Sequence, residues 1–255
     1  IWKSKIIYFS QNFKKIYYEI DSQLKHNIDE NKVITELNNN GFFFAPSIFN
    51  SDTMKVINDE FDKLISDKSY ENSTGNFKNV TQLRLKQIKL LDEKLLYFYS
   101  FFSNKFLKKI ISTYFRTNHK YNHQIFFQKT SLTNKPPANE IHFDKLHQIK
   151  IWIFVNSVDE NNGPIELFLG THKKNKEKRL NFYKKQDLDL ELDNRDHYKH
   201  TKGRKITGPE GSVLIFDSDL FHRASPVNEG KRLIARSHSI STTTLNFRNK
   251  QKYNH

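Results

Sequence analysis

The chain of 255 residues contains no cysteine and carries 42 Lys and Arg against 28 Asp and Glu, a net charge of +14. Its length suits one globular domain, and its 36% hydrophobic residues exclude a largely disordered chain. The absence of thiols excludes disulfides, thiolate metal sites and cysteine nucleophiles, so any metal must be held by His, Asp or Glu. The positive charge would attract an anionic partner, although an A/T-rich coding bias also accounts for a composition with 33 Lys and 9 Arg.

The first 115 residues or so are predicted to be mainly helical. Residues 1–29 are interpreted as an extension of a single domain over 1–255, because this basic, apolar stretch lacks the small-residue cleavage site of a signal peptide. A helix is expected to begin with Ser51 as N-cap, because apolar residues follow at helical spacing: Met54, Ile57, Phe61 and Leu64. A second helical stretch carries Leu91, Leu95, Phe98, Phe102, Phe106 and Ile110. Between them, Gly41 to Pro46 is predicted to be a short buried strand that ends at the proline.

From about residue 121 the pattern changes to strands separated by turns. The segment 147–155 alternates, with isoleucines at 149, 151 and 153 on one face and Lys150, Trp152 and Phe154 on the other. Further strands are expected at 124–132, 164–169, 212–217, 219–225 and 232–241. Helices followed by strands predict an α+β fold, a sandwich or barrel of antiparallel strands backed by helices.

One polar segment, 173–205, interrupts these strands. Its lysines precede its acidic residues, and no apolar periodicity accompanies them. This pattern predicts a surface insertion, either a disordered loop or a lid over a site.

The chemistry is expected at two short segments. His142 and Asp144 are two residues apart, so on an extended strand both side chains project to the same side and can bind one ion. His222 would complete two imidazoles and one carboxylate, the arrangement that leaves positions open on Fe(II) for oxygen chemistry. Arg232, ten residues later, is placed to grip a carboxylate with a two-pronged contact.

The ordered set of motifs resembles the phytanoyl-CoA dioxygenase family of Fe(II)/2-oxoglutarate oxygenases over roughly residues 30–242. The set comprises Gly-Phe-Phe-Phe-Ala-Pro, His-x-Asp, Asn161-Asn-Gly-Pro164, Gly170-Thr-His172, Leu220-Phe-His222, Asn228 and Arg232. The resemblance implies a double-stranded β-helix, or jelly roll. It also implies iron on His142, Asp144 and His222 as catalytic ligands, and 2-oxoglutarate on Arg232.

Other residues follow from the same resemblance. Trp152 falls where the family often places an aromatic beside 2-oxoglutarate, but it could equally line the barrel interior. Gln128 or Lys129 could bond 2-oxoglutarate from the strand before His-x-Asp, and Ser225 lies near a position where the family often has a hydroxyl. Arg236 shares a strand face with Arg232 and could meet the substrate. His172 is interpreted as a structural turn residue, and His147 is left out of the site.

The sequence therefore predicts a soluble, cytoplasmic dioxygenase that uses Fe(II), 2-oxoglutarate and O2 on a small molecule, with an anionic substrate as one alternative. Hydroxylation is favoured over halogenation, because halogenating relatives replace the carboxylate ligand and Asp144 is present. Two rivals remain: an inactive jelly roll that binds a metal or ligand, and a nucleic-acid-binding protein. The second rival is disfavoured, because no recognition motif accompanies the positive charge. No transmembrane segment is expected, because no long apolar run is present.

Overall fold

The computed structural model describes residues 2–70, 77–116, 119–144, 146–185 and 202–241. Its helices are α1 (Trp2–Asn27), α2 (Glu30–Asn40), α3 (Ser51–Ser66), α4 (Gln87–Asp92), α5 (Leu96–Phe102), α6 (Lys105–Phe115) and α7 (Thr171–Lys185). Its strands are β1 (Phe42–Ala45), β2 (Val80–Lys86), β3 (His119–Thr133), β4 (Gln148–Phe154), β5 (Ile165–Phe168), β6 (Arg204–Ile206), β7 (Val213–Asp217), β8 (Phe221–Ala224) and β9 (Val227–Ser241). None of the described helices is both long and apolar enough to cross a membrane.

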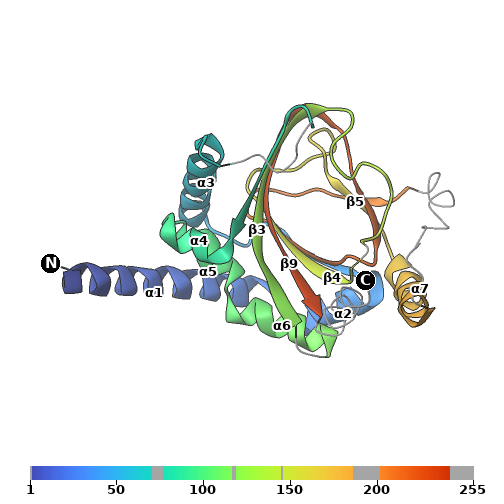
Figure 1. Ribbon diagram of the computed structural model, residues 1–255, viewed down its shortest axis with the longest axis horizontal. Helices are drawn as coiled ribbons and strands as arrows, with labels where there is room; N and C mark the ends of the chain where they lie inside the picture. The colour runs from blue at the N-terminus through green and yellow to red at the C-terminus, as the bar shows by residue number, and fades with distance from the viewer. Residues whose placement is uncertain (1, 71–76, 117–118, 145, 186–201, 242–255) are drawn as a thin grey trace.

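Two antiparallel sheets face each other. The larger sheet has six strands in the order β1-β7-β4-β9-β3-β2, and the smaller has the order β6-β5-β8. Helices α1 to α6 cover the outer face of the larger sheet, while β5 lies across from its inner face (Figure 1). The arrangement matches the jelly-roll prediction, and the space between the sheets is called the interior below.

The alternation of β4 divides the apolar residues between two cores. Ile149, Ile151 and Ile153 are at most 1% exposed and pack with the helices. Trp152 and Phe154 point the other way and join residues of both sheets in a second cluster inside the jelly roll. The sequence pattern therefore predicted which β4 side chains share a face, and the structure shows that the face of Lys150, Trp152 and Phe154 is the interior one.

Several element boundaries differ from the expectations. The N-cap of α3 is Asn50, whose side chain accepts a hydrogen bond from the Thr53 backbone N–H, and not Ser51. The second helical stretch is divided into α4, α5 and α6. Lys94 takes a positive φ of 58° between the first two, and Asn104 caps the third. Strands β2 and β6 were not predicted.

Of the two alternatives for the segment from residue 173, a disordered loop is wrong for residues 173–185, which belong to α7. Asn175 and Arg179 of this helix are buried, with exposed fractions of 1% and 2%. Over residues 171–179, whose side chains the structure describes, the buried groups are polar, so this part of the helix shows no apolar periodicity. The remainder of the polar segment, 186–201, lies outside the described residues.

Candidate functional site

The structure brings His142, Asp144 and His222 together at the edge of the interior. His142 and His222 form a β-bridge, with backbone N–O distances of 3.1 and 2.8 Å. The Asp144 N–H donates to the Ser218 carbonyl at 3.1 Å, which fixes the same extended segment two residues later. Between the two predicted ligands, Phe143 is buried in a small apolar cluster with Phe221. The predicted i, i+2 geometry is thus present.

Both imidazole rings are oriented by backbone carbonyls. His142 Nδ1 lies 2.8 Å from the Glu140 oxygen, and His222 Nδ1 lies 2.8 Å from the Leu220 oxygen. A carbonyl only accepts, so each Nδ1 carries the proton and each Nε2 presents its lone pair. These Nε2 atoms lie 3.9 Å (His142) and 3.6 Å (His222) from Asp144 Oδ1. All three ligand atoms lie within 4.8 Å of one another, close enough to share one ion.

The protonation states suit metal binding. Burial and the neighbouring Lys150 ammonium lower the pKa of His222 to about 3, so its ring is neutral near pH 7. Burial opposes ionisation of Asp144, but the Lys150 ammonium, through its charge and its hydrogen bond, outweighs it and holds the pKa of Asp144 below the usual range. A neutral imidazole and a carboxylate are the forms that coordinate a metal.

Lys150 belongs to the site, although the sequence analysis did not predict its contact with the metal ligands. Its Nζ lies 2.7 Å from Asp144 Oδ2 and 3.3 Å from His222 Nε2. Oδ2 of the carboxylate is therefore tied to lysine, while Oδ1 faces the two histidines. The available signal was a lysine on the interior face of an otherwise apolar strand, since that face is predicted to be buried.

The inner face of the larger sheet carries the other predicted residues. Antiparallel register places Arg232 of β9 opposite Thr130 of β3, and Arg236 opposite both Phe126 and Trp152. Arg232 is 2% exposed and donates through Nη1 to the Gly163 carbonyl. Its Nε has no hydrogen-bond partner among the described residues, and neither does Trp152 Nε1. The wall therefore offers two buried N–H donors to an incoming group.

The alternative between Gln128 and Lys129 is resolved by register. Gln128 pairs with Ile234 of the interior cluster, and its Nε2 donates to Thr130 Oγ1 at 3.0 Å. Lys129 pairs with Leu233, which packs with the helices on the opposite face. Gln128 is thus the one beside Arg232.

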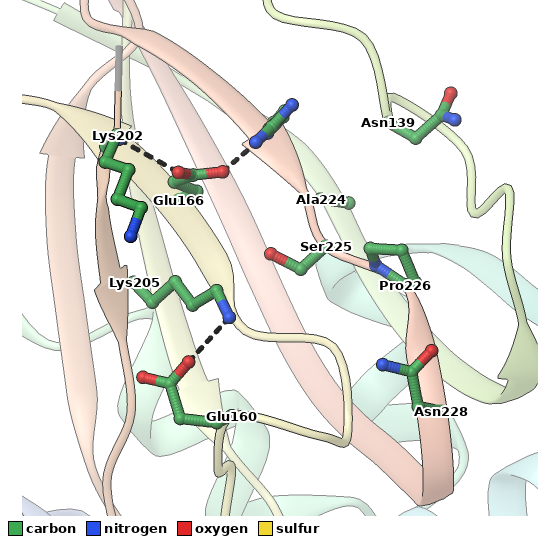
Figure 2. A pocket seen from close by; sticks show the side chains of 11 residues that line it. Asn139, Glu160, Glu166, Lys202, Lys205, Ala224, Ser225, Pro226 and Asn228 are labelled. Carbon is green, nitrogen blue, oxygen red and sulfur yellow. Dashed lines mark hydrogen bonds and ion pairs between the residues drawn. The ribbon is translucent and has the colours of Figure 1, made fainter. Parts of the chain in front are cut away.

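Ser225 lies elsewhere. It lines a pocket of about 670 Å³ on the outer face of the smaller sheet, and none of His142, Asp144 and His222 lines that pocket. Figure 2 shows the Ser225 side chain among charged groups that pair with one another. Glu166 accepts from the Gly203 N–H at 2.9 Å and from Arg223 Nε at 2.5 Å, and Lys205 pairs with Glu160 at 2.6 Å. The structure does not bring Ser225 to the metal ligands.

A second buried cluster of histidine and carboxylates was not predicted from the sequence. This cluster contains His147, which was left out of the predicted site. His147 Nε2 lies 3.0 Å from Asp217 Oδ2 and 3.8 Å from Asp219 Oδ2. Tyr114 donates its hydroxyl to Asp217 Oδ2 at 2.6 Å, and Arg179 Nε donates to Asp219 Oδ1 at 2.7 Å. The signal was the Asp-Ser-Asp sequence just before His222, whose partners come from distant segments.

This cluster supports both ligand-bearing segments. Besides Asp219, Arg179 donates through Nη2 to the backbone carbonyl of Asp144. Asn175 Nδ2 donates to the Asp219 carbonyl at 2.7 Å. Helix α7 therefore connects the Asp144 segment to the loop that leads into His222.

His172 was expected to be a structural turn residue, but it lies in the first turn of helix α7, where it contacts α2. Its Nε2 lies 3.3 Å from the Asn38 carbonyl of α2, and the ring is 4% exposed. It packs at the point where α2 ends in Gly41, whose φ of 83° is in the left-handed region. A Cβ at Gly41 would lie 2.7 Å from His172 Nδ1, so glycine allows this close contact.

The residues present fit Fe(II) and 2-oxoglutarate. Two imidazoles whose Nε2 atoms face one carboxylate oxygen form the donor set that suits non-haem iron. The buried Nε–H of Arg232, without a partner among the described residues, fits a carboxylate of the co-substrate.

Comparisons with known proteins agree with this geometry. Three solved structures are similar over most of the chain at low sequence identity, so they establish the fold. The carbocyclase SnoK from nogalamycin biosynthesis has 11% identity and a TM-score of 0.64 over 85% of each chain. EctD from S. alaskensis with bound Fe has 13% identity and a TM-score of 0.62 over 86% of this chain and 78% of its own. AviO1 from Streptomyces viridochromogenes Tue57 has 14% identity and a TM-score of 0.59 over 85% of this chain and 96% of its own.

Of the two sequence comparisons, only the one with family profiles gives a match. No curated protein sequence matches the chain. The sequence profile of the family described as Phytanoyl-CoA dioxygenase (PhyH) matches residues 37–234, well over half of the chain. The chain therefore belongs to the phytanoyl-CoA dioxygenase family, and the protein is an enzyme of the Fe(II)/2-oxoglutarate-dependent oxygenases.

Proposed function

We propose that the protein hydroxylates a C–H bond of a small molecule that carries an anionic group, with release of succinate and CO2. The observation that carries this proposal is the triad of His142, Asp144 and His222 beside a buried Arg232 whose Nε has no partner among the described residues. A metal site and a carboxylate site on one interior wall are what a 2-oxo dicarboxylate co-substrate requires.

The three ligand residues would hold Fe(II) on one face and leave its opposite face open. Bound iron, with 2-oxoglutarate and O2, would supply the oxidising chemistry. The protein's part is to fix the ligands before the metal arrives. The carbonyls of Glu140 and Leu220 fix the two rings, and Lys150 holds Asp144 Oδ2 so that Oδ1 is presented to the metal.

The co-substrate would lie along the inner face of the larger sheet. Arg232 would bind its far carboxylate, with Gln128 and Thr130 beside it on β3. Trp152 would donate its Nε1–H, which has no partner among the described residues. The surrounding cluster of Phe154, Leu214, Phe216 and Ile234 would exclude water from the reacting atoms.

Hydroxylation is the reaction that the ligand set supports best. Asp144 occupies the position that halogenating relatives leave to a small residue. The names of similar structures include an epimerase, SnoN, and a carbocyclase, SnoK, so the fold itself hosts other outcomes. Two proteins of similar structure, EctD and HygX, have been crystallised with 2-oxoglutarate, which supports the proposed co-substrate.

The test is anaerobic addition of Fe(II) and 2-oxoglutarate while the visible charge-transfer band of the chelated pair is recorded. We expect the band in the wild type, its loss in His222→Ala, and a weaker apparent affinity for 2-oxoglutarate in Arg232→Ala. Lys205→Gln is the matched control, because it removes one surface cation that pairs with Glu160 far from the triad. A folded wild-type protein without the band would contradict the proposal.

Lys150 also favours a second candidate function, an inactive jelly roll that binds ligands without iron. Its ammonium lies 3.3 Å from the ligand atom Nε2 of His222 and 2.7 Å from Oδ2 of Asp144, where it could compete with a metal. In that case the wild type would bind no Fe(II), and Lys150→Met would restore binding. If Lys150 instead orients Asp144, Lys150→Met weakens iron binding, so the two functions predict opposite signs.

A further inference from the structure

The inner face of the larger sheet carries more positive charge than one 2-oxoglutarate can neutralise. On this face, Lys150 of β4 and Arg232 of β9 are buried, and Arg236 of β9 is half-buried. Of these three cations, only Lys150 forms an ion pair with a carboxylate of the described residues, that of Asp144. The two aspartates nearby, Asp217 and Asp219, are engaged by His147 and Arg179. Two guanidinium groups are left without a carboxylate partner in the described part of the chain.

Arg236 is held in place but is not neutralised. Its Nη2 donates to Gln82 Oε1 at 2.6 Å, and its guanidinium carbon lies 5.2 Å from the Phe126 ring centre and 5.6 Å from that of Trp152. Its Nε has no hydrogen-bond partner among the described residues. Burying an unpaired polar group next to a charge is costly, so a fixed guanidinium whose buried Nε–H is unused is poised for an anion.

His238, which lies near Arg236, offers a second unused polar atom to a ligand. His238, two residues along β9, is stacked on Phe126 at 4.9 Å between ring centres. Its Nε2 is buried and has no partner in the described part of the chain. His238 also lies opposite Lys150 in the register of β4 and β9. The unused polar atoms of Arg236 and His238 are thus on the same wall as the lysine that contacts the metal ligands.

The charge balance leaves two positive charges that favour a further anion. The two charges of Fe(II) and the two of 2-oxoglutarate cancel, and Asp144 balances Lys150. The loaded site therefore keeps the charges of Arg232 and Arg236, both of which stay protonated although burial lowers the pKa of each to about 10. If Arg232 binds the co-substrate, Arg236 is available to another molecule.

We propose that Arg236, with His238 beside it, is the binding site for an anionic oxygen group of the substrate, a carboxylate or a phosphate, next to the iron. This inference rests on the proposed function, because it takes Arg232 as the residue that holds 2-oxoglutarate. It makes Arg236 a specificity-determining residue that selects acids over their uncharged analogues.

The experiment uses the protein loaded anaerobically with Fe(II) and saturating 2-oxoglutarate. Butyrate, methyl phosphate and the uncharged butanamide are titrated in turn, and the change of the charge-transfer band is followed. We expect a saturable change with at least one of the two anions and none with butanamide, and the two anions together identify which group is preferred. Arg236→Gln should raise the apparent Kd of that anion by about tenfold or more and change that of 2-oxoglutarate far less.

Two further variants separate the geometry of the Arg236 contact from its charge and control for the loss of a cation elsewhere. Arg236→Lys keeps the charge without the two-pronged geometry and should retain part of the anion binding, which also guards against loss of folding in Arg236→Gln. Lys205→Gln removes an exposed cation and should leave anion binding unchanged. Equal binding of butyrate and butanamide, or no binding of either anion, would overturn the inference. So would a loss of 2-oxoglutarate binding in Arg236→Gln as large as that in Arg232→Gln. A wild type that lacks the band altogether overturns the proposed function itself.

Discussion

Two groups of histidine and carboxylate lie within a short distance of each other, and both are compact enough to hold a metal. They differ in how their polar atoms are used. In the cluster of His147, Asp217 and Asp219, a tyrosine, an arginine and the histidine already engage the carboxylates. In the triad of His142, Asp144 and His222, both Nδ1 atoms are bound by carbonyls and both Nε2 atoms face one carboxylate oxygen. Compactness alone therefore does not identify a metal centre, whereas the direction of the ligand atoms does.

Asp144→Ala tests the triad and has the largest expected effect. Loss of the only carboxylate of the triad should lower succinate formation from 2-oxoglutarate by roughly 100-fold or more, because two histidines alone hold Fe(II) weakly. Asp217→Ala should leave iron bound, with a smaller loss of activity through altered positioning. Equal losses in both variants would remove the distinction between the two groups.

Asp219→Ala tests the second cluster as a structural network. The variant leaves Arg179 buried without its carboxylate, so the free energy of unfolding should fall by about 3–5 kcal/mol. Urea denaturation measures this loss. The control is Asp92→Ala, whose partner Lys89 is as exposed as Asp92 itself, and it should change stability by less than about 0.5 kcal/mol. A similar, small change in both variants would contradict the structural role.

Tyr114→Phe removes one hydrogen bond from the same network. The hydroxyl donates to a buried, charged carboxylate, so its loss should cost about 1.5–3 kcal/mol. The same denaturation series reports it. An unchanged unfolding free energy would mean that the hydroxyl contributes nothing to the network.

His147 gives the second cluster a pH dependence that is modest and of known sign. Burial and Arg179 oppose protonation, but the carboxylates of Asp217 and Asp219 outweigh them and raise the pKa of His147. A raised folded-state pKa gives stability that is full below the ordinary histidine range and is lost as the pH rises through the folded value. Stability should therefore decrease on that rise in the wild type and show a flatter profile in His147→Gln. A wild-type profile that rises over the same range would contradict the sign.

The parts of the site that sequence could predict depend on local spacing. Alternation along β4 placed Ile151 and Trp152 on opposite faces, and the i, i+2 rule joined His142 to Asp144. The contact of Lys150 with Asp144 could not be found this way, because it depends on how a segment without regular structure folds back across β4. The pairing of His147 with Asp217 joins residues 70 positions apart, and no local pattern encodes it.

Helix α7 was also not predicted, because the sequence analysis relied on apolar periodicity to find helices. Its buried residues over 171–179 are a threonine, a histidine, an asparagine and an arginine, so a search for apolar faces passes over this part of the helix. The interpretation of the polar segment as a surface insertion was based on its charge pattern, which is accurate for its exposed lysines and misleading for Arg179.

Arg179 makes tolerance to mutation uneven within one lysine-rich stretch. Its exposed neighbours Lys173, Lys174 and Lys176 should be interchangeable with other polar residues, whereas Arg179 touches both segments that present metal ligands. We therefore expect substitution of Arg179, unlike that of these lysines, to weaken iron binding. Any attempt to shorten the protein here should leave the turns of α7 that carry Asn175 and Arg179 in place.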